Sequence, residues 1–434
     1  MLAPRSSNLT PSSRTTTPRV CKTMAGHDRP QKPILISGAG LASLLLAQAL
    51  HRAAIPFRVY ERDASLSFRA QGYRLRLSDV GLDAIESALG PEKWQKFWQT
   101  TGKTGGAGFT ARDAITGEAL THGGPPAKGA PPPKADAEAR GAKMDLGSRG
   151  GKIVGISRGD MRKIFLEGCE DHVRWSHHVT GYELTSSGVR ALFADGTKSE
   201  EGEMLVGGEG IHSAVAQQVS RGAIRVFDTG ARGIHGQAPA PAFRGLGEGV
   251  WRVQDPGEGG VAIITNVRPN DLEDPDVRYG WTMTAKPGVI RAPKDDYSIV
   301  GKIAAEIAKG KTANWHRKFQ PLFDQMEEAE AAFWKITISD PRGVPEWENE
   351  RRVTVIGDAV HAMTPAGGNG ANTAVRDSAL LGRLLVEAKG KAEEGLTKRY
   401  EQQMRVYGSE MVKKSYELAH TAFGVDVDEN TPTI

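Results

Sequence analysis

Residues 33–61 read PILISGAGLASLLLAQALHRAAIPFRVYE, and this stretch decides the fold class. An apolar run at 33–37 is typical of a short buried strand, and the apolar residues of 41–53 favour a helix. Residues 57–60 have the composition of a second strand. Strand, glycine turn, helix and strand in this order predict a βαβ unit, and therefore an α/β fold with a parallel sheet.

The glycine turn of this unit indicates nucleotide binding. Gly38 permits a tight turn, and Gly40 lets the backbone approach a pyrophosphate at the positive end of the following helix. Glu61 ends the second strand about 20 residues later, where a carboxylate can accept hydrogen bonds from ribose hydroxyls. A chance glycine turn in an unrelated α/β protein is the alternative. The βαβ context and the spaced acid favour the nucleotide site.

A second motif indicates which nucleotide. The apolar strand at 352–356 runs into Gly357-Asp358, and the glycine-rich segment 364–372 precedes a long helix. Asp358 presents a carboxylate at a strand end, and the glycines expose amides at another helix N-terminus. Two such corners about 300 residues apart suit an extended ligand. FAD meets this requirement, whereas NAD alone does not need the second corner.

These two motifs, together with SRGDMR at 157–162, resemble the three FAD signatures of the aromatic-hydroxylase class of single-component flavoprotein monooxygenases. The class includes para-hydroxybenzoate hydroxylase, salicylate hydroxylase and fungal natural-product monooxygenases, and the resemblance covers most of residues 33–421. It implies bound FAD, NAD(P)H as co-substrate, and dioxygen activated as a flavin hydroperoxide. The substrate it implies is small and aromatic or natural-product-like, and the reaction is a hydroxylation.

The resemblance also assigns cofactor-binding residues in this sequence. Glu61 is expected at the adenosine ribose, Asp358 at the ribitol, and Arg158 beside the cofactor. Gly370 and Ala371 are expected at the pyrimidine edge of the flavin. The cofactor-binding residues predicted are Gly38, Gly40, Glu61, Gly72, Arg158, Asp358, Gly370 and Ala371.

One segment departs from the family pattern. The family usually has Asp-Gly after an apolar strand, followed by a serine and an arginine. Here Glu209-Gly210 follows the strand, and Ala216 stands where the arginine is expected. Because this region is associated with both FAD and the pyridine nucleotide, the change bears on NAD(P)H use rather than on FAD binding.

Two residues are predicted to be catalytic. Arg244 and Tyr279 fall on strands expected to cover the flavin, and in related enzymes such residues orient or activate a phenol-like substrate. The alternatives are an arginine at a sheet edge and a tyrosine in the core. Arg74 and Arg76 are comparable candidates.

Charge and composition exclude several other classes. The tail 1–30 holds five basic residues and one acidic residue, while the remainder has 51 of each, so its body offers no basic surplus to nucleic acid. Two cysteines exclude a disulfide framework, and the histidines lack metal-ligand spacing. No apolar run reaches the length of a membrane span. We expect a cytoplasmic protein, since the tail resembles a transit peptide but lacks an apolar helical face.

The domain organisation follows from these patterns. We predict a disordered tail at 1–30 and a Rossmann-like FAD-binding domain assembled from 31–110, 151–225 and 350–390. The Gly/Pro-rich stretch 123–150 reads as a flexible insertion. Alternating apolar and polar residues predict a mixed or antiparallel-sheet substrate domain at 230–345, and helical patterns predict a C-terminal helical region at 391–425.

Two alternatives remain open. A flavin-dependent epoxidase or oxidative cyclase could use the same scaffold, whereas halogenation is disfavoured because no Trp-x-Trp-x-Ile-Pro segment is present. Glu209 and Ala216 also leave open a flavin-binding protein without turnover. The sequence does not give the oligomeric state.

Overall fold

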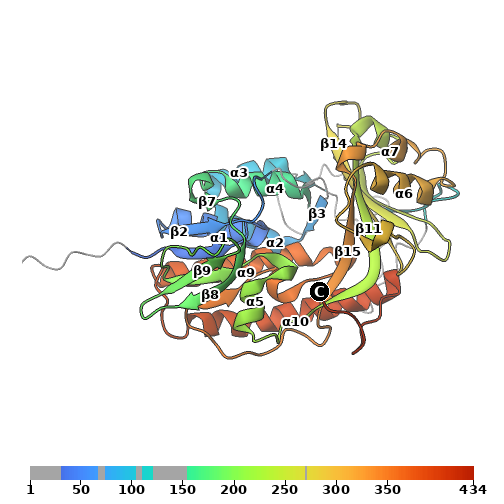
Figure 1. Ribbon diagram of the computed structural model, residues 1–434. Helices are drawn as coiled ribbons and strands as arrows, with labels where there is room; N and C mark the ends of the chain where they lie inside the picture. The colour runs from blue at the N-terminus through green and yellow to red at the C-terminus, as the bar shows by residue number, and fades with distance from the viewer. Residues whose placement is uncertain (1–30, 67–73, 104–109, 121–153, 269–270) are drawn as a thin grey trace, which may run out of the picture. The chain divides into compact units, whose positions relative to one another are not determined.

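The computed structural model describes residues 31–66, 74–103, 110–120, 154–268 and 271–434 (Figure 1). The predicted tail, the predicted insertion at 123–150 and Gly72 lie outside these ranges. In the described part, no helix is both long enough and apolar enough to cross a membrane.

A five-stranded parallel sheet holds both glycine motifs. Its order is β16-β10-β1-β2-β7, and each neighbouring pair is parallel. Every residue of its central strand is buried, as expected for a parallel strand covered on both faces. The strands are β1 (Ile34–Ser37), β2 (Phe57–Tyr60), β7 (Val173–Arg174), β10 (Met204–Gly207) and β16 (Val353–Val355).

Helices from distant parts of the chain enclose this sheet in the larger hydrophobic core. The first helix packs against the second, fourth and ninth, and the last helix runs along the lower edge in Figure 1. These helices are α1 (Leu41–Arg52), α2 (Asp79–Leu89), α3 (Pro91–Thr100), α4 (Arg158–Leu166), α5 (Ala214–Val219), α8 (Asp358–His361), α9 (Gly370–Glu387) and α10 (Leu396–Phe423).

A second sheet of six strands has the order β15-β11-β14-β13-β12-β5. Its pairs are antiparallel except β12 with β5. One face packs with α6 (Lys302–Thr312) and α7 (Pro321–Asp324) in a separate core. The strands are β5 (Thr110–Asp113), β11 (Val226–Pro239), β12 (Gly249–Gln254), β13 (Ala262–Val267), β14 (Arg278–Ala285) and β15 (Ala332–Ser339).

Smaller elements complete the described fold. A three-stranded sheet has the order β3-β6-β4, and β8 pairs with β9 as a hairpin. These strands are β3 (Arg74–Leu77), β4 (Gly102–Lys103), β6 (Val154–Ser157), β8 (Val179–Leu184) and β9 (Val189–Phe193). Short 3-10 turns occur at Glu170–His172, Gly210–His212, Ala240–Phe243, Pro293–Asp295, Glu328–Glu330 and Ala366–Gly368.

Glycines interrupt two stretches for which the sequence pattern predicts a helix. Residues 78–100 have a helical pattern but form two helices, because Gly90 adopts a φ of 78° and Pro91 starts a new helix. Residues 371–421 have a second helical pattern, which is divided where Gly390 and Gly395 have positive φ. The sequence also predicts a hairpin at 106–120; it is described only in part, and its strand β5 joins the second sheet beside β12. The domain boundaries stay a prediction.

Candidate cofactor and substrate site

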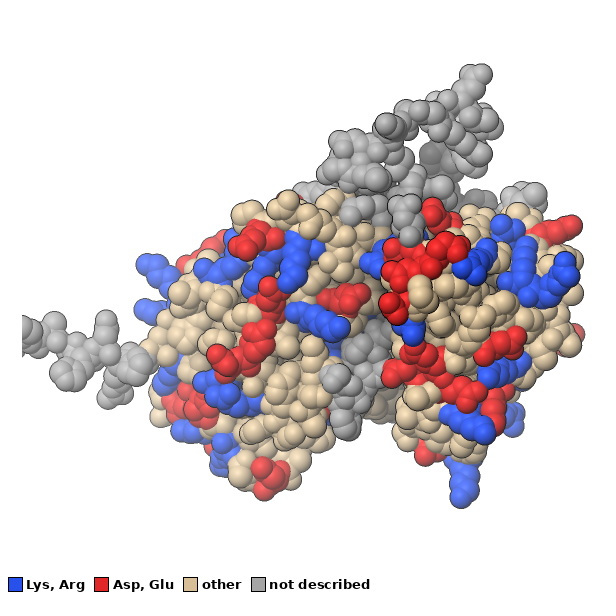
Figure 2. All heavy atoms as spheres, turned by 90° about the horizontal axis from the view of Figure 1, so that it is seen from above, with Lys and Arg blue, Asp and Glu red and all other residues tan. Residues whose placement is uncertain are grey.

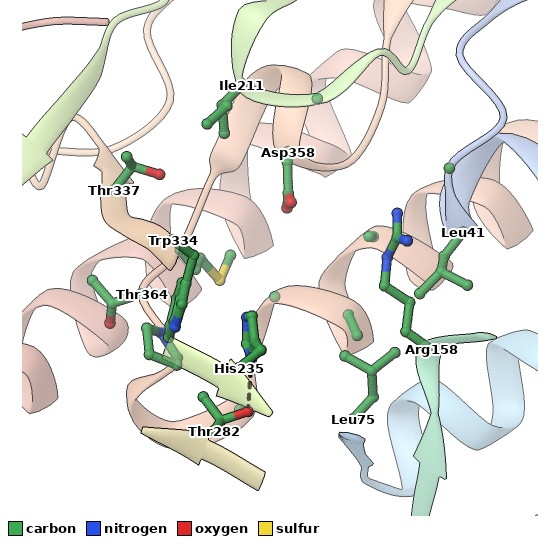
Figure 3. Close-up of a pocket in the computed structure, with 18 of the residues that line it drawn as sticks. Leu41, Leu75, Arg158, Ile211, His235, Thr282, Trp334, Thr337, Asp358 and Thr364 are labelled. Atoms are coloured by element: carbon green, nitrogen blue, oxygen red, sulfur yellow. Dashed lines mark hydrogen bonds between the residues drawn. The ribbon is translucent and has the colours of Figure 1, made fainter. Parts of the chain in front are cut away.

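One cavity of about 2060 Å³ connects the two large sheets. The carboxyl ends of the parallel strands line one part of it, and one face of the second sheet lines another. Figure 3 shows Arg158, Asp358 and His235 arranged around this space. A site for a single small ligand usually measures about 300–1,000 Å³. The cavity therefore has room for a cofactor and a second molecule together.

The β1–α1 turn forms the first corner of the cavity. Gly38 has a φ of +85°, and a Cβ there would lie 2.7 Å from the carbonyl oxygen of Gly208. Helix α1 begins after Gly40 with no side-chain cap and no acidic residue in its first turn. Its first amides are thus left for an anion, as expected for a pyrophosphate site.

Glu61 holds this corner in shape. Its Oε2 accepts a hydrogen bond from the Ala39 amide at 2.6 Å, and its Oε1 accepts one from the Asp63 amide at 2.9 Å. Glu61 also lines the cavity. The predicted contact with ribose hydroxyls stays a prediction, and the structure adds a second task, the bracing of the glycine turn.

A buried arginine that the sequence argument passed over also supports the turn. Arg162 is 3% exposed, and its Nε and Nη2 donate to the Ala39 carbonyl oxygen at 3.2 and 3.0 Å. It lies one helical turn after Arg158, the predicted cofactor contact, and both residues line the cavity. The i, i+4 spacing in the SRGDMR segment was the signal available in the sequence.

Asp358 brings a desolvated carboxylate to the second corner. Its side chain faces the cavity in Figure 3, on a turn where Gly357 has a φ of 63°. Desolvation within the cavity raises the pKa of Asp358, while the charges of His361 and Arg158 partly offset this rise. Because the carboxylate is exposed to the cavity, it can accept hydrogen bonds from a ligand that brings hydroxyl groups.

Asp377 anchors the turn that carries Asp358. This fully buried carboxylate accepts hydrogen bonds from the Gly357 amide at 2.7 Å and the Tyr407 hydroxyl at 2.6 Å. Its Oδ2 also lies 2.7 Å from Nε2 of His361. Burial lowers the pKa of His361, but the neighbouring Asp377 outweighs it and the net shift is upward. Asp377 and Tyr407 were not predicted, because only the packing of α9 and α10 brings them to the turn.

The start of α9 forms the rest of the second corner. Gly370 and Ala371 line the cavity, and α9 begins without a side-chain cap or an acidic residue in its first turn. Asn372 fixes this end against β3: its Oδ1 accepts from the Ser78 amide at 2.8 Å, and its Nδ2 donates to the Arg76 carbonyl oxygen at 2.9 Å. The predicted residues of this corner are therefore brought together.

Glu209, where the sequence departs from the family pattern, also lines the cavity. Glu209 Oε1 accepts from the Val215 amide at 3.1 Å, and its Oε2 is buried without a hydrogen bond to a described residue. Burial raises the pKa of Glu209 to about 7. Ala216 is 1% exposed, so an arginine would not fit there without rearrangement.

The second sheet presents polar side chains to the cavity. Successive residues of a strand point to opposite faces, and His235, Thr282 and Trp334 lie on the cavity face. The His235 ring stacks on Trp334 with 4.9 Å between centroids, and its Nδ1 lies 3.1 Å from the Thr282 hydroxyl. Sequence reasoning missed His235, because its face depends on the register of β11.

The two predicted catalytic residues are not brought to this cavity. Tyr279 lies three residues before Thr282 on β14, so its side chain points to the opposite face of the sheet. It is fully buried in the second core, and its hydroxyl donates a hydrogen bond to Asp271 at 2.6 Å. Arg244 is exposed and pairs with Glu273. Neither residue lines the cavity. Tyr279 therefore occupies its alternative position in the core, whereas Arg244 lies at the surface directly after the 3-10 turn Ala240–Phe243 and not on a strand. The geometry does not support a catalytic role for either residue.

Among the described residues, no group of three or more histidines, cysteines or carboxylates could hold a metal ion. The face seen in Figure 2 carries basic and acidic side chains interspersed. It therefore shows no large field of one sign.

A family model described as "FAD binding domain" matches residues 31–415. The chain belongs to this family. The family predicted from the three motifs is thereby confirmed. Two uncapped helix N-termini and a desolvated carboxylate in one cavity fit the pyrophosphate and the polyol of FAD, so the residues present agree with the cofactor.

Curated relatives include FAD-dependent monooxygenases. The chain is 29% identical over 408 residues to the dual O-methyltransferase/FAD-dependent monooxygenase elcB of Phaeosphaeria nodorum, an alignment that covers 83% of this chain and 41% of the relative. It is 25% identical over 409 residues to the FAD-dependent monooxygenase adaC of Aspergillus niger, which covers 86% of this chain and 89% of that protein. The chain spans less than half the length of the first relatives it matches.

A solved structure shares the fold. Klebsiella pneumoniae HpxO, complexed with FAD and uric acid, superimposes with a TM-score of 0.65 at 21% identity, covering 91% of this chain and 90% of that one. The α/β fold with a Rossmann-like FAD-binding domain, predicted from the sequence, is thus confirmed.

Proposed function

We propose that this chain is an FAD-dependent monooxygenase that uses NAD(P)H and dioxygen to hydroxylate a small aromatic or natural-product-like molecule. The observation that carries the proposal is that one cavity is shared by the two large sheets. Its nucleotide corners at Gly38 and Asp358 open into a space that is also lined by a sheet face bearing His235 and Trp334. A binding site for FAD alone would not require this second lining.

Bound FAD would supply the redox chemistry, taking electrons from NAD(P)H and activating dioxygen. The chain's own residues would bind and orient the cofactor. The α1 amides would face the pyrophosphate, Glu61 would accept from the ribose, and Asp358 would accept from the ribitol. Gly370 and Ala371 would lie against the flavin edge, with Arg158 beside the cofactor.

The experiment begins with purified holoprotein and a panel of phenols and naphthols. Heat-released supernatant should contain FAD, and NADPH or NADH should reduce the bound flavin under anaerobic conditions. On admission of isotopically labelled dioxygen, one oxygen atom should enter the product. Release of FMN alone, or reduction by dithionite but by neither coenzyme with any panel member, would contradict the proposal.

Glu209 and Ala216 favour a second candidate, a flavin-binding protein without turnover. A monooxygenase would oxidise the coenzyme and a flavin-binding protein without turnover would not, whereas both would contain FAD. An epoxidase or oxidative cyclase would also consume coenzyme, and product analysis separates it from a hydroxylase.

A further inference from the structure

Four residues form one row across the second sheet on its cavity side. His235 on β11 lies opposite Thr282 on β14, and Thr282 lies opposite Ile264 on β13. Ile264 in turn lies opposite Arg252 on β12. All four line the cavity. Because directly opposed residues point to the same face, the row is a continuous strip from His235 to Arg252.

The strip has two polar ends, and Thr282 and Ile264 lie between them. Three strand spacings of about 4.8 Å separate the backbones of His235 and Arg252 by roughly 14 Å. Between them, Ile264 is 37% exposed although it is a large apolar residue. An apolar side chain exposed within a cavity provides a surface for a ring system.

Arg252 has no partner within the described part of the chain. No hydrogen bond or ion pair involves it there, and its Nε is buried without an acceptor. Burial lowers the pKa of Arg252, and no neighbouring carboxylate offsets the change. Other basic residues that line the cavity are engaged: Arg62 lies near Asp63, Arg76 donates to the Gly367 carbonyl oxygen, Arg162 donates to the Ala39 carbonyl oxygen, and Lys335 lies near Asp228.

The acidic residue of the adjoining row is directed elsewhere. Asp113 on β5 lies opposite Gln254, one row from Arg252. Its Oδ1 accepts hydrogen bonds from the amides of Ile115 and Thr116 at 2.8 and 2.9 Å. A desolvated guanidinium without a protein carboxylate is suited to an anionic group of a ligand.

The other end of the strip is a neutral hydrogen-bonding group. Burial, and to a lesser extent the charge of Arg158, lowers the pKa of His235 to about 3. The imidazole is therefore uncharged at neutral pH. A neutral imidazole pairs with hydroxyl groups, and its stacking on Trp334 fixes the ring plane.

We propose that the substrate is an elongated aromatic compound with a hydroxyl group at the His235 end and a carboxylate that pairs with Arg252. This inference rests on the proposed monooxygenase function and specifies its substrate class. The aromatic rings lie over Ile264. Arg252 is a specificity-determining residue that holds the carboxylate, and His235 positions the hydroxyl end.

Three biphenyl probes test the strip. The hydroxy acid has a hydroxyl at one end and a carboxylate at the other; the phenol has only the hydroxyl, and the plain acid has only the carboxylate. Each is titrated into oxidised holoenzyme, and the change in the visible flavin spectrum gives the dissociation constant. The wild type should bind the hydroxy acid at least about tenfold more tightly than the phenol. Para-hydroxybenzoate, too short to span the strip, should gain no such advantage.

Variants assign this preference to residues. Arg252→Gln should raise the dissociation constant of the hydroxy acid by about tenfold or more and change that of the phenol by less than about twofold. Arg252→Lys should recover part of the lost affinity for the hydroxy acid. The wild type should also bind the hydroxy acid more tightly than the plain acid, and His235→Phe, which keeps an aromatic ring beside Trp334, should abolish this difference. The matched control is Arg278→Gln on β14, an exposed arginine that pairs with Glu327 outside the cavity.

Two results would overturn the inference: equal affinity of the wild type for the hydroxy acid and the phenol, or a preference that survives in Arg252→Gln. FAD content and coenzyme oxidation, measured on the same preparations, separate this failure from that of the proposed function. If the protein contains FAD and oxidises NAD(P)H but shows no Arg252-dependent preference, only the proposed substrate strip is contradicted. If the protein contains no FAD, both the proposed function and the strip are contradicted.

Discussion

Three carboxylates at the carboxyl ends of the parallel strands differ because their surroundings differ. Glu61 accepts two backbone amides, so it braces the first turn. Asp358 faces the cavity, and desolvation there raises its pKa. Glu209 caps the amide of Val215 through one oxygen only. A carboxylate deprived of donors is either protonated or satisfied by a ligand, which makes Asp358 and Glu209 the residues most sensitive to the cofactor.

Asp358→Ala should weaken FAD binding by about ten- to a hundredfold, because a buried hydroxyl of the ligand loses a charged acceptor. Titration of deflavinated protein with FAD measures the change. Glu410→Ala, at an exposed site on α10, is the control and should bind FAD as the wild type does. Unchanged affinity in Asp358→Ala would remove this residue from the cofactor site.

Glu209 should make the stability of the deflavinated protein depend on pH. Its folded pKa of about 7 lies above its ordinary value of 4.5, so the folded state binds more protons between these two values. Stability contributed by the protonated form is therefore lost as pH rises from about 4.5 to about 7, by about 1.4 kcal/mol per unit of pKa shift as an upper bound. Melting temperatures across this range should fall in the wild type and fall less in Glu209→Gln. Identical slopes would contradict the shift.

At this scale the sequence predicted residues inside motifs and missed those that depend on packing. Glu61 and Asp358 follow directly from a strand end and its spacing. Asp377 reaches the Gly357 turn through the packing of α9 with α1 and α10, which no local pattern encodes. Tyr279 was misplaced for a related reason: alternation predicts two faces, and only the sheet register decides which one meets the cavity.

Among the elements, two helix N-termini and their preceding turns organise the cofactor end. Both α1 and α9 begin after glycine-rich turns, and neither has a side-chain cap. Their apolar lengths made them predictable, as did the strands that precede them. The ends of other helices were less accessible from sequence. Gly90-Pro91 divides α2 from α3, and a period-3.6 pattern continues across that break.

Gly38→Ala should remove FAD binding or prevent folding, because its Cβ would lie 2.7 Å from the Gly208 carbonyl oxygen. Gly196→Ala is a matched control: φ is +84° against +85° for Gly38, but nothing lies within 4 Å of its added Cβ. The control should lose only about 1–2 kcal/mol, the cost of a left-handed alanine, and should keep its flavin. Flavin content and melting temperature report both effects. Equal behaviour of the two variants would show that the approach to Gly208 is unimportant.

At the scale of the whole molecule, the cavity joins segments that are far apart in sequence. Turns near residues 38, 209 and 358 meet the face of β11, β13 and β14. The sequence predicted two functional regions from composition and motif order. It did not predict that β5 would join the second sheet, since a strand of four residues carries too little pattern to choose its partner. A ligand that fills this cavity contacts both cores at once.

FAD should therefore stabilise the chain beyond its own binding corners. A ligand present at 100 times its dissociation constant adds about 2.7 kcal/mol to the free energy of unfolding, equivalent to about 3–5 °C for a chain of this size. Melting should be followed by tryptophan fluorescence in a variant whose four tryptophans at the first core, Trp94, Trp98, Trp175 and Trp347, are replaced by phenylalanine. The four that remain, Trp251, Trp281, Trp315 and Trp334, lie in the second core or line the cavity. Adding FAD to deflavinated protein should raise the transition of the whole body, including this tryptophan signal. If the tryptophan transition stays fixed while the flavin-binding part alone is stabilised, the cofactor does not couple the two sheets, and the cavity is then two adjacent sites rather than one.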